Sequence, residues 1–340
     1  MADRIPVTVL TGYFGAGKTT LLNRILTEDH GRRYAVIVNE LGEIGIDADL
    51  VVCGDDELFE MNNGCICCTV RGDLIRTIQS LLLKEVRFDA ILVETTGIAD
   101  PGPIVQTFFV DHVLQAKTIL DSVTTVVDAK HILRRLADSR EAQEQIAFAD
   151  QLVLNKIELV AEEELAEIEA SLRKLNPLAP IHRTQRTNVA LDRVLGRGGF
   201  DLERIVALEQ DFLEPGPSES GHSHAEHCDH ERDATVHLHD SEIGSVALMS
   251  RIPMDRDKIT RWLTELLATH GQDILRAKGI IDVKDEDRRL VFQAVHMLLE
   301  GDLQQAWRPN EARYSRLVFI GRNLDRAALQ AAFASCAASP

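Results

Sequence analysis

Five runs of apolar residues occur in the first half of the chain, and each run leads into polar or charged residues. They span residues 5–10, 34–40, 90–97, 124–128 and 150–156. Such runs are typical of buried parallel strands, which present functional groups at their C-terminal ends. Apolar residues at helical spacing lie between the runs, most clearly over residues 69–84 and 161–175. This alternation predicts an α/β fold with a mostly parallel, doubly wound sheet that is covered on both faces.

The pattern changes near residue 213. The segment that follows is rich in Pro, Gly, Ser and His and poor in apolar residues, which is typical of a flexible linker. Beyond it, the pattern predicts a smaller α+β unit whose last helix is capped by Asn323 or Asp325. The expected elements are a strand at 245–253, a helix at 255–269, strands at 279–283, 289–298 and 316–321, and a helix at 325–336. We therefore expect three regions, at residues 1–213, 214–242 and 243–340.

The formal net charge of the chain is −17, which disfavours nucleic acid and anionic membranes as partners. The first residues, MADRIPVTVLTG, contain no apolar signal core, and no apolar run approaches the roughly 20 residues that cross a bilayer. We therefore expect a cytoplasmic protein whose six cysteines are mostly reduced. Clustered cysteines in that compartment indicate metal binding or catalysis more often than disulfides.

Residues 12–20, GYFGAGKTT, fit the phosphate-binding pattern G-x-x-x-x-G-K-[ST] between an expected strand and an expected helix. In this pattern backbone N–H groups surround phosphate oxygens, the lysine reaches the β- and γ-phosphates, and the hydroxyl binds Mg²⁺. Lys18 and Thr19 are expected to take the last two roles. The expected nucleotide-binding residues of the loop are Gly12, Gly15, Ala16, Gly17, Lys18, Thr19 and Thr20.

Two further segments are expected to complete the nucleotide site. The third apolar run ends in ETTG, where Glu94 is placed to hold Mg²⁺ and the Gly97 N–H to contact a γ-phosphate. LVLNKIE supplies Asn155, Lys156 and Glu158, where GTPases commonly carry N-K-x-D. Glu158 is one methylene longer than the aspartate that accepts hydrogen bonds from guanine, and a strand end running into a charged helix is the alternative interpretation. Lys18, Thr19, Glu94 and Gly97 are the expected catalytic residues.

Three cysteines, Cys65, Cys67 and Cys68, fall within the sequence GCICC. The turn-prone Asn-Asn-Gly just before them allows all three thiolates to face one ion. Three thiolates suit Zn²⁺ or another thiophilic ion and leave a fourth position for a carboxylate, water or a client ligand. Glu40 and Glu43 are the nearest acidic candidates. The alternative is that the cysteines are small buried hydrophobic residues.

The linker holds a second candidate metal site, because His/Cys-rich tracts bind divalent metals through imidazole. A solvated linker without function is the alternative. The isolated residues Cys53 and Cys336 are expected to be core or incidental residues. The candidate ligands of the linker are His222, His224, His227, Cys228, His230, His237 and His239.

These motifs together resemble the CobW-type metallochaperone GTPases, relatives of the GTPases that assist nickel loading of urease and hydrogenase. The resemblance runs through TGYFGAGKTTLLNRIL, VNELGEIGID, NNGCICCTVRGDL, ETTGIADP, VVDAKH and LVLNKIE, and it continues into RLVFQAVHMLLEG and SRLVFIGRNLD. It implies a P-loop GTPase domain followed by a CobW-type C-terminal α+β domain. It also implies that the GCICC cysteines bind Zn²⁺ and deliver it to a client metalloprotein. Glu40, Glu43 and Asp47 lie in a segment similar to the nucleotide-responsive switch of the family.

The expected function is therefore a metallochaperone that hydrolyses GTP with Mg²⁺ and carries Zn²⁺, with Co²⁺ or iron as alternative cargo. Loss of the γ-phosphate would move the metal ligands and make release directional. A zinc buffer or sensor with structural nucleotide, and a small-molecule P-loop kinase, are the competing hypotheses. The sequence names no client and is compatible with a homo-oligomer without defining one.

Overall fold

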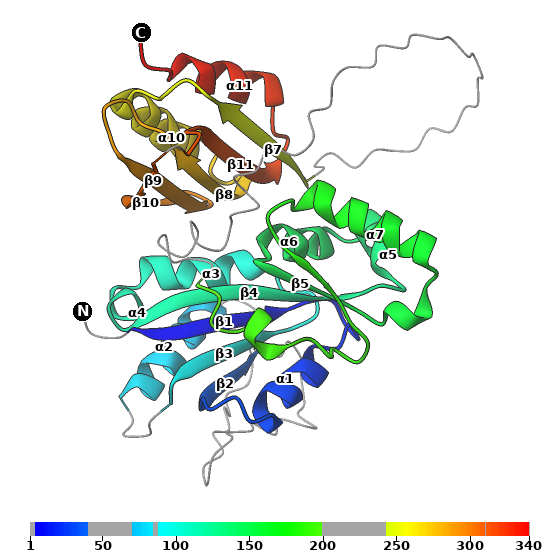
Figure 1. The fold of residues 1–340 in the computed structure, drawn as a ribbon. Helices are drawn as coiled ribbons and strands as arrows, with labels where there is room; N and C mark the ends of the chain where they lie inside the picture. The colour runs from blue at the N-terminus through cyan, green and yellow to red at the C-terminus, as the bar shows by residue number, and fades with distance from the viewer. Residues whose placement is uncertain (1–3, 40–69, 84–87, 199–242, 310, 340) are drawn as a thin grey trace, which may run out of the picture.

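The computed structural model describes residues 4–39, 70–83, 88–198, 243–309 and 311–339. These residues form two units, each built on one β-sheet, with the C-terminal unit lying over helices of the N-terminal unit (Figure 1). Among the described residues, every helix is too short or too polar to traverse a lipid bilayer.

The N-terminal sheet has six strands in the order β2-β3-β1-β4-β5-β6, and all neighbouring pairs are parallel. This confirms the predicted doubly wound α/β fold. The strands are β1 (Ile5–Thr11), β2 (Tyr34–Asn39), β3 (Ala90–Thr95), β4 (Thr118–Asp128), β5 (Gln151–Asn155) and β6 (Ile181–Arg183). The helices are α1 (Lys18–Thr27), α2 (Val70–Leu82), α3 (Pro101–Val110), α4 (His112–Lys117), α5 (Ile132–Asp138), α6 (Arg140–Phe148) and α7 (Glu162–Leu175), with short 3₁₀ turns η1 (Ile157–Leu159) and η2 (Leu191–Arg193).

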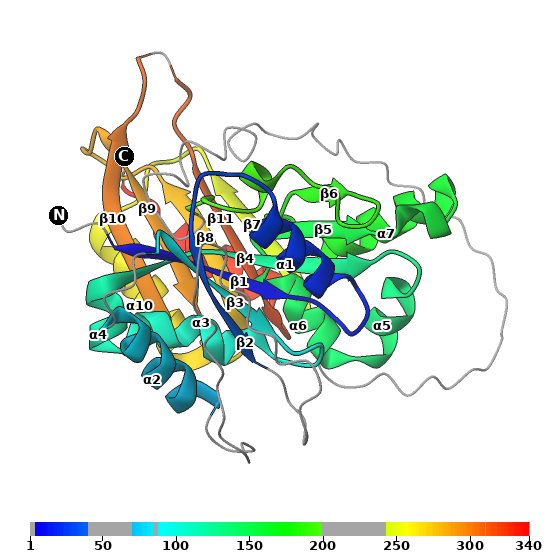
Figure 2. The same ribbon diagram turned by 90° about the horizontal axis from the view of Figure 1, so that it is seen from below.

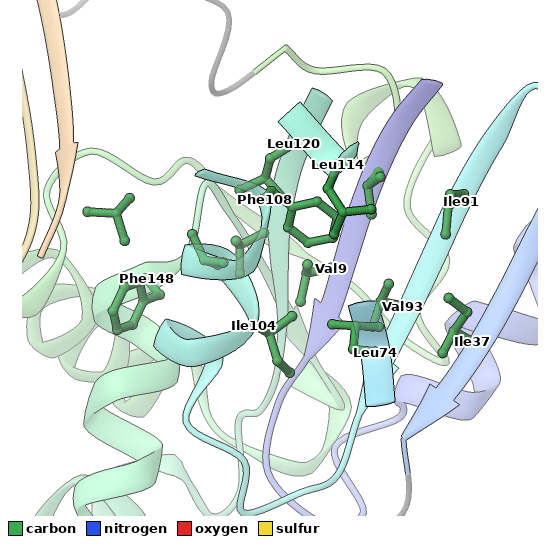
Figure 3. Packing of buried hydrophobic residues seen from close by; sticks show 14 of the residues in the cluster. Val9, Ile37, Leu74, Ile91, Val93, Ile104, Phe108, Leu114, Leu120 and Phe148 are labelled. Atoms are coloured by element: carbon green, nitrogen blue, oxygen red, sulfur yellow. The ribbon is translucent and has the colours of Figure 1, made fainter. Parts of the chain in front are cut away.

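Both faces of this sheet are buried, because neighbouring residues of each central strand pack against different helices. Leu10 of β1 packs on the face that α1 covers with Leu21. Val9 packs on the opposite face, among Ile104 and Phe108 of α3 (Figure 3). Figure 2 shows α1 and α2 on opposite sides of the central strands. The continuous apolar runs of the sequence therefore reflect strands that are covered on both faces.

The C-terminal sheet is antiparallel, with five strands in the order β10-β9-β8-β11-β7. Helices α10 and α11 pack on one of its faces. Asp325 caps α11 by accepting a hydrogen bond from the Ala328 N–H at 2.9 Å, whereas Asn323 adopts a left-handed backbone conformation before the cap. The elements are β7 (Ile243–Ser250), α10 (Arg256–His270), β8 (Ile274–Ile281), β9 (Arg288–Val295), β10 (Leu298–Ala306), β11 (Ser315–Arg322) and α11 (Arg326–Ser335).

Several predicted elements differ from the structure. The strand expected over 289–298 is wrong in its extent, because His296 takes a φ of 51° and turns the chain into β10. Strand β10 lies at the edge of the sheet and has many exposed residues. Its sequence therefore contains no apolar run that would predict a strand. Strand β8 begins at Ile274 rather than at 279, and β6 was not expected at all. The proposed domain boundaries near 213 and 242 lie outside the described residues.

The second face of the C-terminal sheet packs against the N-terminal unit. Phe148 at the end of α6 belongs to the same apolar cluster as Val295 of β9 and Ile320 of β11. Helices α3 and α4 and strands β1 and β3 also contribute to that cluster. The two units therefore share one continuous apolar core rather than meeting through a solvated surface.

Candidate functional site

The loop between β1 and α1 places a lysine ammonium inside a turn of backbone. Lys18 Nζ donates hydrogen bonds to the carbonyl oxygens of Gly12 at 2.9 Å and Tyr13 at 3.4 Å. Burial lowers the pKa of Lys18, and the neighbouring Glu94 carboxylate opposes part of that shift. A Cβ atom at Gly12 would lie 2.2 Å from the Val126 carbonyl oxygen, at a φ of 139°. Only glycine therefore allows the loop to leave β1 along this path.

Two oxygen donors face each other beside this loop. The Thr19 hydroxyl donates a hydrogen bond to Glu94 Oε1 at 3.3 Å. Glu94 is buried near the end of β3, which lies next to β1 in the sheet. A hydroxyl and a carboxylate are the kind of oxygen donors that hold Mg²⁺ together with water and phosphate. The pair therefore meets the chemical requirement for the predicted magnesium site.

Gly97 lies directly against the phosphate-binding loop. A Cβ atom at this position would lie 2.7 Å from the backbone N of Phe14 and 2.6 Å from its ring, so a side chain would push the two segments apart. The buried amide of Gln145, on α6, donates hydrogen bonds to the carbonyl oxygens of Gly97 and Ala99, both at 3.1 Å. No motif in the sequence indicates that Gln145 contacts this segment.

The NKIE segment lies on the other side of the loop. Asn155 Nδ2 donates a hydrogen bond to the Ala16 carbonyl oxygen at 2.9 Å, which ties the end of β5 to the phosphate-binding loop. Asn155 Oδ1 accepts from the Thr187 N–H at 2.8 Å. Lys156 has a left-handed backbone conformation and pairs with Asp128 at 2.7 Å. The structure thus brings all three predicted segments of the nucleotide site to one edge of the sheet.

Glu158 lies in the η1 turn with its side chain exposed. Two residues that hold this region were not predicted, Asp128 and Thr187. Asp128 ends β4, and a polar residue at the end of an apolar run is the signal that pointed to Glu94. Thr187 follows the short strand β6 in a left-handed conformation, and no motif in the sequence indicates it.

The predicted zinc ligands lie outside the described residues. This applies to Cys65, Cys67, Cys68, Glu40 and Glu43, and to the histidine-rich set His222, His224, His227, Cys228, His230, His237 and His239. Within the described ranges, no group of three or more His, Cys, Asp or Glu side chains is arranged to hold a metal ion. Cys336 is buried in the core of the C-terminal unit, which confirms its expected core role.

Comparison with known proteins connects this geometry to a family. Residues 6–183 match the CobW/HypB/UreG nucleotide-binding domain, and residues 243–337 match the cobalamin synthesis protein cobW C-terminal domain. The zinc chaperone YjiA of Escherichia coli K12 is 34% identical over 97% of this chain and 98% of its own length. Zinc-regulated GTPase metalloprotein activator 1 of Schizosaccharomyces pombe is 33% identical over 95% of this chain and 84% of its own.

A solved structure shows the same likeness in three dimensions. The crystal structure of the Zn(II)-bound YjiA GTPase from E. coli aligns with a TM-score of 0.74 and 31% identity, and the alignment covers 99% of this chain and all of that one. Both sheets are therefore included in the match. The chain belongs to the CobW/HypB/UreG family and combines its nucleotide-binding domain with a CobW C-terminal domain.

Proposed function

We propose that this protein is a GTPase that binds Zn²⁺ at Cys65, Cys67 and Cys68 and transfers it to a client metalloprotein. The family membership supports nucleotide binding. Zinc is supported by relatives named as zinc chaperones and by the Zn(II)-bound YjiA structure. In this chain, the three cysteines of the GCICC motif supply the thiolates that commonly bind Zn²⁺ in proteins.

The observation that carries the proposal is where the cysteine-bearing segment leaves the sheet. Asn39, the last residue of β2, pairs with Thr95 of β3, and Val38 pairs with Glu94. Strand β2, the last described element before the three cysteines, therefore ends at the edge of the sheet where Glu94 meets Thr19. We therefore expect a change in the contacts of the γ-phosphate to reach the chain that leads to Cys65, Cys67 and Cys68.

Each residue of the nucleotide site has a role that suits GTP hydrolysis. Lys18 would bind the β- and γ-phosphates, and Gly97 N–H would contact the γ-phosphate. Thr19 and Glu94 would hold Mg²⁺, which when bound neutralises negative charge on the phosphate oxygens. Asn155, Lys156 and Glu158 would contact the guanine base. Zn²⁺ is the cargo, and Glu40 or Glu43 would supply a fourth ligand that opens with the nucleotide state.

Replacing Cys65, Cys67 and Cys68 with alanine tests the zinc site. We expect zinc affinity to fall by at least about 100-fold, because even outer-shell changes around a metal cost about 10–100-fold. The stimulation of GTP turnover by zinc should be lost as well. The measurement is GTP turnover of the metal-free protein in reducing buffer, with zinc titrated in and bound metal counted.

Two controls make this result specific. Cys53→Ala removes a cysteine outside the motif and should leave both readouts unchanged. A chelating dye then serves as acceptor, so that zinc release is compared under GTP and under a non-hydrolysable analogue. Faster release with GTP supports directional transfer. Release that ignores hydrolysis, or zinc held only by the histidine-rich linker, would make a zinc buffer the better description.

Shortening Glu158 to aspartate tests recognition of the base. The exposed position of Glu158 leaves room for the shorter side chain, and aspartate would restore the usual two-point contact with guanine. We expect Glu158→Asp to bind GTP about tenfold more tightly while ATP affinity stays constant, since a well-placed hydrogen bond to a charged group is worth about 1.5–3 kcal/mol. Equilibrium binding of fluorescent GTP and ATP analogues measures the ratio.

The matched control is Glu163→Asp, the same change on the first turn of α7. It should alter neither affinity. If Glu158→Asp weakens GTP binding instead, the loop is built around the longer side chain and glutamate is the proper base-reading residue here.

A further inference from the structure

Helix α6 lies between residues 96–99, the Gly97 segment, and the C-terminal unit. On one side, Gln145 holds the carbonyl oxygens of Gly97 and Ala99 through a single buried amide. The backbone carbonyl of Gln145 also accepts a hydrogen bond from the Thr125 hydroxyl at 2.8 Å. Gln145 further borders a cavity of about 50 Å³ that Tyr13 and Phe14 of the phosphate-binding loop also line. The phosphate-binding loop and α6 therefore meet around one small space, and Gly97 contacts Phe14 and Gln145 beside it.

On its other side, α6 carries buried charged contacts to the C-terminal sheet. Glu144, the residue before Gln145, forms an ion pair with Arg322 of β11. Two residues beyond the helix, Asp150 pairs with Arg276 and, at 3.2 Å, with Lys278, both of β8. All of these side chains are nearly excluded from solvent. Breaking such pairs leaves unpaired buried charge, which is costly, so the C-terminal sheet has to follow α6.

The turn between β9 and β10 makes a second contact with the N-terminal unit, at α6 and at the start of α3. His296, at the turn between β9 and β10, packs its ring against Phe148 with 5.4 Å between ring centroids. A Cβ atom at Gly102, in the first turn of α3, would lie 2.9 Å from His296 Nε2. Burial lowers the pKa of His296, so the ring packs as an uncharged group at neutral pH. The hairpin turn thus touches both α6 and the start of α3.

We propose that Gln145 is a positioning residue that couples the Gly97 segment to the C-terminal domain, so that the nucleotide state sets the position of the β9–β10 hairpin. This rests on the nucleotide-binding part of the proposed function and adds how the second domain responds to it. When Gly97 shifts to contact a γ-phosphate, the buried Gln145 amide has to keep its acceptors, because a buried donor without an acceptor is costly. Helix α6 therefore moves with the segment and carries the C-terminal sheet.

Hydrogen exchange of the full-length protein tests this coupling in the absence of zinc and with Mg²⁺ present. The wild type is compared under saturating GDP and under a saturating non-hydrolysable GTP analogue, and exchange is followed in peptides from residues 288–306. We expect the two nucleotides to change exchange in the hairpin by about fivefold or more, in the range typical of allosteric coupling. In Gln145→Met, which keeps the length of the side chain but removes the donor, this difference should be lost.

Two further variants keep the test specific. Gln143→Met changes the same residue type on the same helix, where the side chain donates a hydrogen bond to the Leu136 carbonyl oxygen at 2.7 Å, and it should retain the hairpin response. Arg322→Met removes the Glu144 pair, one of the contacts at the far end of the link, and leaves the Asp150 pairs and the Phe148–His296 contact in place. It should reduce the response of the hairpin while the peptide containing Gly97 still distinguishes the two nucleotides, and it supplies the test if Gln145→Met fails to fold.

The possible results separate this inference from the proposed function. A wild-type protein that binds no GTP contradicts the proposed function. A wild-type protein that binds both nucleotides without any hairpin response contradicts only the coupling. The coupling is also overturned if the hairpin response survives unchanged in Gln145→Met or in Arg322→Met.

Discussion

Replacing Lys18 with alanine is expected to lower the affinity for GTP by about 100-fold, because removing one member of a buried charge pair typically costs about 2–5 kcal/mol. The Lys18 ammonium is already held within the phosphate-binding loop by the carbonyl oxygens of Gly12 and Tyr13. The Lys18 side chain is therefore already ordered before a nucleotide binds, and it loses little conformational freedom on binding. Isothermal titration with GTP, at constant free Mg²⁺, measures the effect.

Lys174→Ala is the matched control, since this lysine is exposed near the end of α7 and far from the loop along the chain. It should bind GTP as the wild type does. A Lys18→Ala variant that keeps its affinity to within about threefold would contradict the assignment of the loop, because that difference corresponds to less than about 1 kcal/mol.

Replacing Asp150 with alanine is expected to lower the free energy of unfolding by about 3–5 kcal/mol, the usual cost of removing one partner of a buried ion pair. The change leaves Arg276 and Lys278 as buried cations without this carboxylate. It also removes the acceptor of the Val123 N–H, at 2.9 Å. Urea unfolding, followed by circular dichroism and tryptophan fluorescence, measures the loss.

Asp138→Ala provides the comparison, because Asp138 pairs with Arg134 and Arg135 on the exposed side of α5. Exposed pairs contribute at most about 1 kcal/mol, so this variant should unfold close to the wild type. Equal free energies of unfolding for the two variants would mean that the Asp150 pairs between the units contribute little to stability.

The same carboxylate makes stability depend on pH. Burial by itself would raise the pKa of Asp150, but Arg276, Lys278 and the Val123 N–H more than offset this and hold the pKa below its ordinary value. A carboxyl whose pKa is depressed in the folded state stabilises the protein fully above its unfolded pKa of about 3.9. That contribution is lost as the pH falls through the lower, folded value, so in Asp150→Ala this acid-dependent loss should be absent.

The parts of the fold that could be predicted from sequence are those whose signal is local. Strand β1, the phosphate-binding loop and α1 follow from one apolar run, two glycines and helical spacing within about 20 residues. Glu94 and Asn155 lie beside the loop because parallel strands end at one edge of a sheet. Their roles in nucleotide binding stay a prediction. The zinc ligands lie outside the described residues, and they stay a prediction.

What could not be predicted depends on contacts between distant segments. Arg276 and Lys278 alternate with apolar residues in β8, a pattern that normally indicates a face exposed to water. Their face is buried instead, because Asp150 lies against it, 126 positions away from Arg276 along the chain. The Gln145 contact to Gly97 spans 48 positions, and nothing near Gln145 in the sequence marks it. Pairing of this kind is visible only in the folded chain.

The shared apolar core has a consequence for how the protein is made. The cluster around Phe148 is completed by Val295, Val318 and Ile320, which are synthesised well after Phe148. Until they emerge from the ribosome, the N-terminal unit presents an uncovered apolar face formed by α3 and α6. Such faces promote association between unfinished chains. We therefore expect the nascent protein to be most prone to aggregation in the period before its C-terminal sheet packs against α3 and α6.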